Sequence, residues 1–294
     1  MPVKLIAERF PVIEPTNLNF PWLLAFTTLA EHREERFDFM AGKGEAQRRE
    51  LEAALAPMAV TWLTLEHGAT IVDLTELPSL RGDSKQTNLP SLRGVSEASD
   101  VAIYGSDSIV GGLTQRTDPQ FQTSPFPSPH ADGAILTTPG HAVAFTTADC
   151  LPIICVCEQL RVVAVLHAGW RSLAAGIIES AIQRMQADYG VDPVALKAWV
   201  GPAIAQQDYE VSTDTRTALL ERPAVTTQLF SPTRPGHWLA DLPGAATAIL
   251  TSLGLPVASI ARHPQSTLQS LQLHSARRDG TTSGRMATVV GMTC

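Results

Sequence analysis

The sequence predicts an α/β protein, built as a single-domain layered α/β sandwich over residues 1–294. From residue 131 onward, short apolar runs that favour strands are separated by turn residues, as in a buried sheet. An amphipathic helix follows these runs, and strands and helices continue to alternate after it, which is typical of helices packed on a sheet. A hydrophobic content of 44% is that of an ordinary globular protein with an ample core.

The first part of the chain supplies a few elements of this sandwich. Residues 1–30 contain Pro and short apolar runs, which indicate strands or irregular structure. Residues 44–56 consist of strong helix formers and end before Pro57, so they predict a helix. Predicted strands follow at residues 60–65 and 69–74.

The second part is more regular. A helix is expected at residues 170–189, because an apolar stripe runs along it and Gly190 follows it. A strand at residues 195–200 and a helix at residues 239–253 come after it. Four short apolar runs before the long helix predict buried strands at residues 134–137, 142–146, 151–157 and 162–166.

Residues 75–129 differ from the rest of the chain, being rich in Ser, Thr, Gly, Pro and Asp. They contain a short duplication, in which Leu-Pro-Ser-Leu-Arg-Gly at residues 77–82 recurs at residues 89–94. Two copies are too few for a solenoid, which needs several stacked units. We therefore expect an exposed insertion in the domain. A lid or a loop that docks a partner is the alternative.

Charge and hydropathy exclude several classes of partner. The net charge is −7 and no run is rich in Lys or Arg, so neither nucleic acid nor an acidic membrane surface is an expected partner. No apolar run reaches the roughly 20 residues that span a bilayer, and residues 1–9 lack the apolar core of a signal peptide. A cytoplasmic location is therefore expected.

The cysteines are expected to be free thiols. Cys150, Cys155 and Cys157 lie within eight positions, which is unlike a disulfide framework, and Cys294 lies far from them. A reducing cytoplasm agrees with this interpretation. Cys155 and Cys157 alternate on a predicted strand, so they share one face, where we expect them to pack as small hydrophobic residues.

A thiol and an imidazole lie at the ends of predicted strands, where side chains converge at a sheet edge. Cys150 precedes one such strand, His167 ends another, and His67 precedes a third. Cys and His serve either as nucleophile and base or as soft metal ligands. These three residues suit a metal site with an open fourth position. Asp149 must be partnered or lie at a cleft, because an unpaired buried carboxylate is costly.

Two further segments suit an anionic ligand. Gly169 opens the helix behind His167, and a helix N-terminus offers N–H groups to an oxyanion, a phosphate or a thiolate. Arg277, Arg278 and Arg285 lie among Gly and hydroxyl residues, and such guanidinium groups bind phosphate or carboxylate through paired hydrogen bonds. A structural network of Arg and Asp is the alternative for this segment.

Four motifs resemble the bacterial YfiH family, whose members are often labelled multicopper polyphenol oxidase or laccase-domain proteins. The similarity covers residues 130–291 and extends more weakly through His67. The combination is highly specific in this order. The motifs are Thr-Ala-Asp-Cys-Leu-Pro at 147–152, His-Ala-Gly-Trp-Arg at 167–171, Gly-Pro-Ala-Ile at 201–204 with Tyr-Glu-Val at 209–211, and Arg-Arg-Asp-Gly through Gly-Arg at 277–285.

This resemblance implies a CNF1/YfiH-like α/β sandwich and a metal held by His67, Cys150 and His167, usually zinc, with copper as the alternative. It implies a purine nucleoside phosphorylase, for which adenosine or inosine and phosphate give the base and ribose 1-phosphate. Adenosine deaminase and methylthioadenosine phosphorylase activities are attributed to the same site. Arg48 lies where the family usually has an Asn-Arg pair, although Gln47 replaces the Asn.

The expected site residues follow from these motifs. Catalysis is assigned to Cys150, His167 and Asp149. The residues expected to bind the nucleoside or phosphate are Arg48, Arg277, Arg278 and Arg285.

Three other functions compete with this one. A metal-free thiol hydrolase or deamidase would use Cys150 as nucleophile and His167 as base. A copper-dependent polyphenol oxidase is the second alternative, although a true laccase is disfavoured, because a multicopper centre needs many imidazoles and the chain has eight His and no His-x-His pair. A single copper ion could still give weak oxidase activity. A non-catalytic binding protein is supported only by the insertion and by departures from the family motifs.

Overall fold

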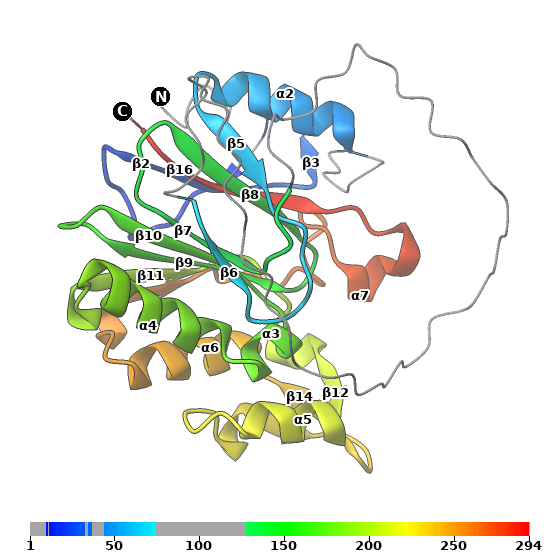
Figure 1. Cartoon of the computed structure of the whole chain (residues 1–294). Coiled ribbons are helices and arrows are strands. Elements are labelled where there is room, and N and C mark those ends of the chain that lie inside the picture. The colour runs from blue at the N-terminus through cyan, green and yellow to red at the C-terminus, as the bar shows by residue number, and fades with distance from the viewer. Residues whose placement is uncertain (1–9, 11, 33–34, 37–43, 75–127, 294) are drawn as a thin grey trace, which may run out of the picture. The chain divides into compact units, whose positions relative to one another are not determined.

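The computed structural model describes residues 10, 12–32, 35–36, 44–74 and 128–293. Two mixed β-sheets dominate this part of the chain, with helices on their outer faces (Figure 1). The predicted α/β class is therefore confirmed. The predicted insertion at 75–129 lies outside the described residues, apart from residues 128–129. Among the helices in the described ranges, none is both long and apolar enough to cross a membrane.

The first sheet has five strands and is mostly antiparallel. Only the edge strand β5 runs parallel to its neighbour β8, and β16 lies between β2 and β8. In spatial order the strands are β1 (Val12–Ile13), β2 (Leu23–Thr28), β16 (Met286–Met292), β8 (His141–Thr147) and β5 (Ala59–Trp62).

The second sheet has six strands. Its centre is antiparallel, and a parallel strand lies at each edge. In spatial order the strands are β15 (Ile260–Arg262), β11 (Leu196–Val200), β9 (Leu151–Cys157), β10 (Val162–Ala168), β7 (Gly133–Leu136) and β6 (Ile71–Asp73). The apolar runs of the sequence thus become β9 and β10, every residue of which is buried.

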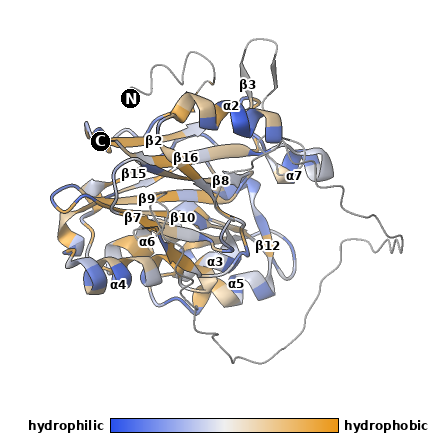
Figure 2. Ribbon diagram, turned by 45° about the horizontal axis from the view of Figure 1, so that its top comes forward, coloured by the Kyte–Doolittle hydropathy of each residue, from blue (hydrophilic) through white to orange (hydrophobic). Residues whose placement is uncertain are grey.

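Helices cover the outer face of each sheet. Helix α2 (Glu45–Leu55) packs on the first sheet through Leu51 and Leu55, in a core shared with Trp62. Helices α4 (Ile177–Tyr189) and α6 (Leu242–Ser252) cover the second sheet (Figure 1). Figure 2 shows hydrophobic residues concentrated along the strands and hydrophilic residues on the outer sides of the helices.

The alternation of side chains along the strands determines which residues lie between the two sheets. On β10, Ala164 and Leu166 belong to the core beneath the helices, so Val163 and Val165 face the other way, as does His167. On β8, Ala142 and Ala144 belong to the core beneath α2. The alternate residues of β8, including Phe145 and Thr147, therefore face the second sheet.

Smaller elements complete the described chain. A three-stranded sheet consists of β12 (Glu210–Ser212), β14 (His237–Ala240) and β13 (Phe230–Pro232), and α5 (Thr213–Leu220) packs beside it. A short ladder joins β3 (Glu31–His32) to β4 (Glu35–Arg36). Short helices are α3 (Trp170–Ala174) and α7 (Ala276–Asp279), with single 3₁₀ turns at Pro193–Ala195, Gln206–Asp208, Thr227–Leu229, Val257–Ser259 and Gly280–Thr282.

Two predicted helices differ from the structure. The helix expected at 170–189 is divided into α3 and α4, because Gly176 adopts the left-handed conformation between them, with φ of 82°. The helix expected at 239–253 begins later. Residues 239–240 belong to β14, and Asp241 caps α6 by accepting a hydrogen bond from the N–H of Gly244 at 2.7 Å.

Candidate metal centre and its pocket

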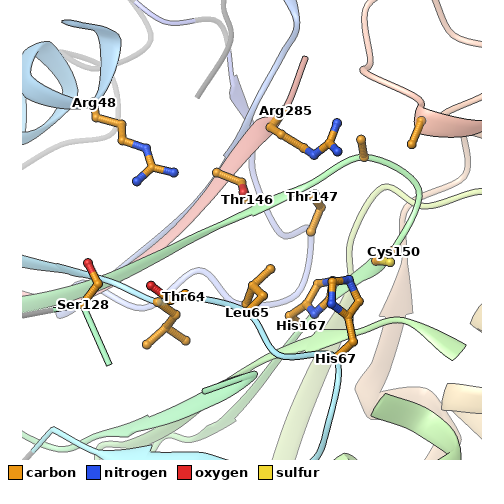
Figure 3. A pocket seen from close by; sticks show the side chains of 13 residues that line it. Arg48, Thr64, Leu65, His67, Ser128, Thr146, Thr147, Cys150, His167 and Arg285 are labelled. Carbon is orange, nitrogen blue, oxygen red and sulfur yellow. The ribbon is translucent and has the colours of Figure 1, made fainter. Parts of the chain in front are cut away.

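His67, Cys150 and His167 come together at one end of the space between the two sheets (Figure 3). His67 lies between β5 and β6, Cys150 lies between β8 and β9, and His167 is the penultimate residue of β10. One ligand atom from each residue lies within 4.8 Å of the others. The structure thus brings together the three residues that the family resemblance assigned to a metal.

The spacing of these donor atoms is slightly wider than that of a loaded site. Zinc–ligand bonds of about 2.0–2.3 Å in a tetrahedron place donor atoms about 3.3–3.8 Å apart. Ligation therefore requires the side chains to close by about 1 Å. His67 is the member best able to move, because its side chain is exposed while His167 is buried. A thiolate with two imidazoles suits zinc, and it also suits copper(I).

Asp132, which sequence reasoning missed, orients two of these residues. This carboxylate is fully buried, and its Oδ1 accepts hydrogen bonds from the N–H of His67 at 2.8 Å and from Nδ1 of His167 at 3.1 Å. Its Oδ2 accepts from the N–H of Gly68 at 2.7 Å. The bond to Nδ1 leaves Nε2 of His167 as the ligand atom. Asp132 precedes a Gly at a strand start, a pattern that is more typical of a turn.

Burial, hydrogen bonds and neighbouring charges shift the pKa values of these groups. Burial opposes ionisation of Asp132, but hydrogen bonds from His167, Gly68 and His67 outweigh it and lower the pKa of this carboxyl. Burial likewise opposes protonation of His167, yet hydrogen bonds to Asp132 and Cys150 raise its pKa to about 9. The pKa of His67 is lowered, mainly by the partial burial of its ring and then by the charge of His167.

The backbone around the cluster adopts uncommon conformations. His67 and Asp149 have positive φ values of 61° and 89°, which side-chain-bearing residues seldom adopt. Gly169 lies so close to Cys150 that an added Cβ would approach its Sγ to 3.0 Å. The absence of a side chain at Gly169 therefore allows the thiol to lie against the start of α3.

A cavity of about 480 Å³ opens beside the cluster. Figure 3 shows the cluster at one end of it and Arg48 at the opposite end, with Arg285 above the threonines between them. Its lining residues are Arg48, Leu63, Thr64, Leu65, His67, Ser128, Thr146, Thr147, Ala148, Cys150, His167, Ala276 and Arg285.

Two of the four arginines expected to bind a ligand line this cavity. Arg48, on α2, places its guanidinium 4.2 Å from the centre of the Trp62 ring. Arg285 precedes β16 and donates to the carbonyls of Ser283 and Gly284 at 3.1 and 2.9 Å, respectively. Its positive charge is the smallest of the effects that lower the pKa of His67.

Arg277 lies outside the cavity lining. Its side chain is exposed, stacks on the Tyr209 ring at 5.0 Å and donates to the carbonyl of Glu210 at 3.2 Å. Asp149 is partnered, as expected: Thr267 Oγ1 and the N–H of Arg277 donate to its two carboxylate oxygens at 2.5 and 2.7 Å. Asp149 therefore joins the Cys150 loop to the segment that carries the C-terminal arginines.

Arg278 lies outside the cavity lining, in a network of hydrogen bonds with its own segment. Its guanidinium forms a paired contact with the Asp279 carboxylate, with both distances 2.8 Å. The same group donates to four backbone carbonyls, those of Thr267, Leu268, Ser270 and Leu273. These bonds engage its N–H groups and favour the structural alternative for Arg278.

The fold and this site define a layered α/β protein with a His–Cys–His cluster in a pocket between two sheets. Residues 41–293 match the family described as multi-copper polyphenol oxidoreductase laccase, and the chain belongs to this family. Solved YfiH-like structures share the fold. YlmD from Geobacillus stearothermophilus has a TM-score of 0.69 and 23% identity, covering 94% of this chain and 93% of its own. A YfiH protein of Bacillus licheniformis has a TM-score of 0.71 and 19% identity, covering 96% and 99%.

Curated relatives match a shorter region. A protein of Xylella fastidiosa strain Temecula1, named purine nucleoside phosphorylase, is 36% identical over 166 residues, which is 56% of this chain and 62% of the relative. The Escherichia coli K12 protein named purine nucleoside phosphorylase YfiH is 34% identical over 167 residues, which is 56% of this chain and 65% of the relative. The chain thus aligns with less than two thirds of the length of each.

Proposed function

We propose that this protein is a metal-dependent purine nucleoside phosphorylase, which converts adenosine or inosine and phosphate to the free base and ribose 1-phosphate. The observation that carries this proposal is the cavity, because it combines the His67–Cys150–His167 cluster with the guanidinium groups of Arg48 and Arg285. The names of the relatives from Xylella fastidiosa and Escherichia coli support the same reaction. Cavities of this volume accommodate small molecules of nucleoside size.

The metal assigned to the cluster is zinc, held by Cys150 Sγ, His167 Nε2 and a ring nitrogen of His67. Bound there, zinc supplies Lewis-acid chemistry and charge stabilisation. Asp132 maintains the orientation of His167 by accepting from Nδ1. Copper is the alternative metal, because the same donor set suits copper(I).

Arg285 is assigned to the phosphate in this proposal. Arg285 lines the same cavity as the cluster, and a positive charge there favours an anion during the transfer. Arg48 at the opposite end of the cavity is assigned to the nucleoside. Arg277 is assigned a supporting role, since it contributes an N–H to Asp149 and lies outside the cavity lining.

Deamination of adenosine is a second activity that the same pocket could support. In that case water is the second substrate, and the product is inosine, formed without phosphate. Methylthioadenosine is a further candidate for phosphorolysis. The test is product identification from adenosine by chromatography, with and without phosphate, together with elemental analysis of the purified protein. Phosphate-dependent adenine is expected, and inosine formed equally in both buffers would contradict the phosphorylase assignment.

A metal-free thiol hydrolase or deamidase is the competing function, and one observation favours it. The hydrogen bond between Cys150 and His167 and the raised pKa of His167 describe a thiol beside a basic imidazole. Full activity after removal of bound metal would support this alternative. A multicopper oxidase receives no such support, since the only candidate metal cluster within the described ranges contains two histidines.

A further inference from the structure

Thr147 occupies a special position in the cavity. It is the last residue of β8, and its side chain shares the inner face of the sheet with Phe145, whose ring centre lies 6.2 Å from that of His167. The side chain of Thr147 lines the cavity, and Figure 3 shows it between Arg285 and the imidazole of His167.

The hydroxyl of Thr147 is buried and has no hydrogen-bond partner among the described residues. The residue is 2% exposed, and its Oγ1 is one of a small group of unpaired buried polar atoms. Other buried threonines of the same sheet are paired: Thr27 and Thr288 bond to each other at 2.8 Å, and Thr28 accepts from the N–H of Ala287 at 2.9 Å. An unpaired buried hydroxyl is costly, so a native one calls for an explanation.

The register of the sheet brings Thr147 close to Arg285 in the fold. Thr147 lies directly opposite Met286, the first residue of β16, and Arg285 immediately precedes Met286 in the chain. Both Thr147 and Arg285 line the same cavity. A guanidinium and a hydroxyl that line the same cavity can both donate hydrogen bonds to the oxygens of a tetrahedral anion bound in it.

We propose that the Thr147 hydroxyl donates a hydrogen bond to an oxygen of the phosphate substrate, and that Thr147 and Arg285 together form the phosphate subsite above the cluster. Rotation about the Cα–Cβ bond exchanges the hydroxyl and the methyl group, so the hydroxyl can turn into the cavity when phosphate enters. This inference rests on the proposed phosphorylase function. It identifies Thr147, a residue to which the sequence motifs gave no role, as one that selects phosphate.

Substitution at one position provides the test. Thr147→Val removes the hydroxyl and keeps the shape, whereas Thr147→Ser keeps the hydroxyl and removes the methyl group. We expect Thr147→Val to raise the KM for phosphate about tenfold, the loss of roughly one hydrogen bond to a charged group, with the KM for adenosine changed less than about twofold. Thr147→Ser is expected to restore the phosphate KM. Thr251→Val, on the exposed face of α6, is the control for general effects of a Thr→Val substitution.

A binding measurement separates this inference from the proposed reaction. Calorimetric titration of metal-loaded protein with inorganic phosphate needs no turnover, and the dissociation constant should rise about tenfold in Thr147→Val only. If phosphate binding depends on Thr147 but adenosine is not phosphorolysed, the reaction assignment fails and the subsite stands. If the wild type turns over and Thr147→Val binds phosphate equally well, the subsite is wrong. A wild type that binds no phosphate, or a Thr147→Val effect on the adenosine KM alone, also overturns it.

Discussion

Asp132 illustrates at the scale of one residue how the cluster is held. Its carboxylate contacts the backbone of His67, the backbone of Gly68 and the ring of His167, so one buried group positions two candidate ligands that are distant in the sequence. Carboxylates that accept from a metal-bound histidine orient the ring and increase its basicity. The geometry of the three candidate ligands therefore depends on a residue that is not itself a ligand.

Replacing this carboxylate should weaken metal binding while the ligands remain. In Asp132→Asn the amide keeps the size but places a donor against N–H groups that need an acceptor. We expect zinc affinity to fall by about 10–100-fold, as measured by competition with a chromophoric chelator. Asp188→Asn on the exposed surface of α4 is the matched control. Unchanged affinity in a correctly folded Asp132→Asn protein would show that the carboxylate does not position the ligands.

At the scale of the element, the segment around α7 is held by residues that had been expected to bind phosphate. Arg278 joins Asp279 to four carbonyls of residues 267–273, and Asp149 holds the N–H of Arg277. Ala276, at the start of α7, lines the cavity. These bonds therefore support one wall of the cavity from behind.

The adjacent residues Arg277 and Arg278 should contribute very differently to the stability of the fold. Arg278→Ala leaves several carbonyls and a carboxylate without their donor, and its side chain is 22% exposed. We expect a loss of about 2–4 kcal/mol in the free energy of unfolding, since hydrogen bonds to charged groups contribute about 1.5–3 kcal/mol each. Arg277→Ala, at an exposed side chain, should change stability by less than about 1 kcal/mol. Denaturant unfolding measures both, and a larger loss for Arg277→Ala would refute this division of roles.

The elements differ in how well the sequence alone predicts them. Strand β9 and helix α2 agree closely with prediction, because an uninterrupted apolar run and a run of helix formers ending at a Pro are strong local signals. Strand β16 was not predicted, although it lies between β2 and β8 in the first sheet. Its assignment depends on pairing with residues far away in the chain, and local patterns carry no information on that pairing.

For the candidate site too, local sequence patterns do not show which distant residues come together. His67, Cys150 and His167 were found through family motifs, since their sequence spacing is too wide for a short zinc signature. Asp132 had no comparable signal, because its function appears only when β7 pairs with β10 and places it beside His167. The carbonyl and carboxylate partners of Arg278 were not predicted, since a run of arginines predicts guanidinium chemistry but not which acceptors lie within reach.

At the scale of the whole molecule, the segment of unusual composition should be dispensable for the fold. Residues 77–94 contain the duplicated hexapeptide and few large apolar residues, so they offer little surface to bury. Deletion of residues 77–94 is expected to leave the melting temperature within about 2 °C of the full chain and the zinc content unchanged, as judged by calorimetry and elemental analysis. A fall of many degrees would mean that the segment packs into the core.

Metal binding should stabilise the whole fold, because the three candidate ligands come from separate parts of the chain. They lie after β5, between β8 and β9, and on β10, so both sheets contribute. A ligand that binds only the native state stabilises it by about 4 kcal/mol when the free ligand concentration is 1,000 times the dissociation constant. For a chain of this size, that corresponds to a rise of roughly 5–10 °C in Tm.

Thermal unfolding of zinc-loaded and chelator-treated protein tests this coupling. Cys150→Ala should abolish the zinc-dependent increment in Tm, since it removes the thiolate ligand. Cys155→Ala is the matched control: this thiol is fully buried in the core beneath the helices, so its loss should lower Tm in both states and leave the increment intact. If Cys150→Ala retained the full increment, zinc would be binding elsewhere and the thiol–imidazole pair would be free for nucleophilic chemistry.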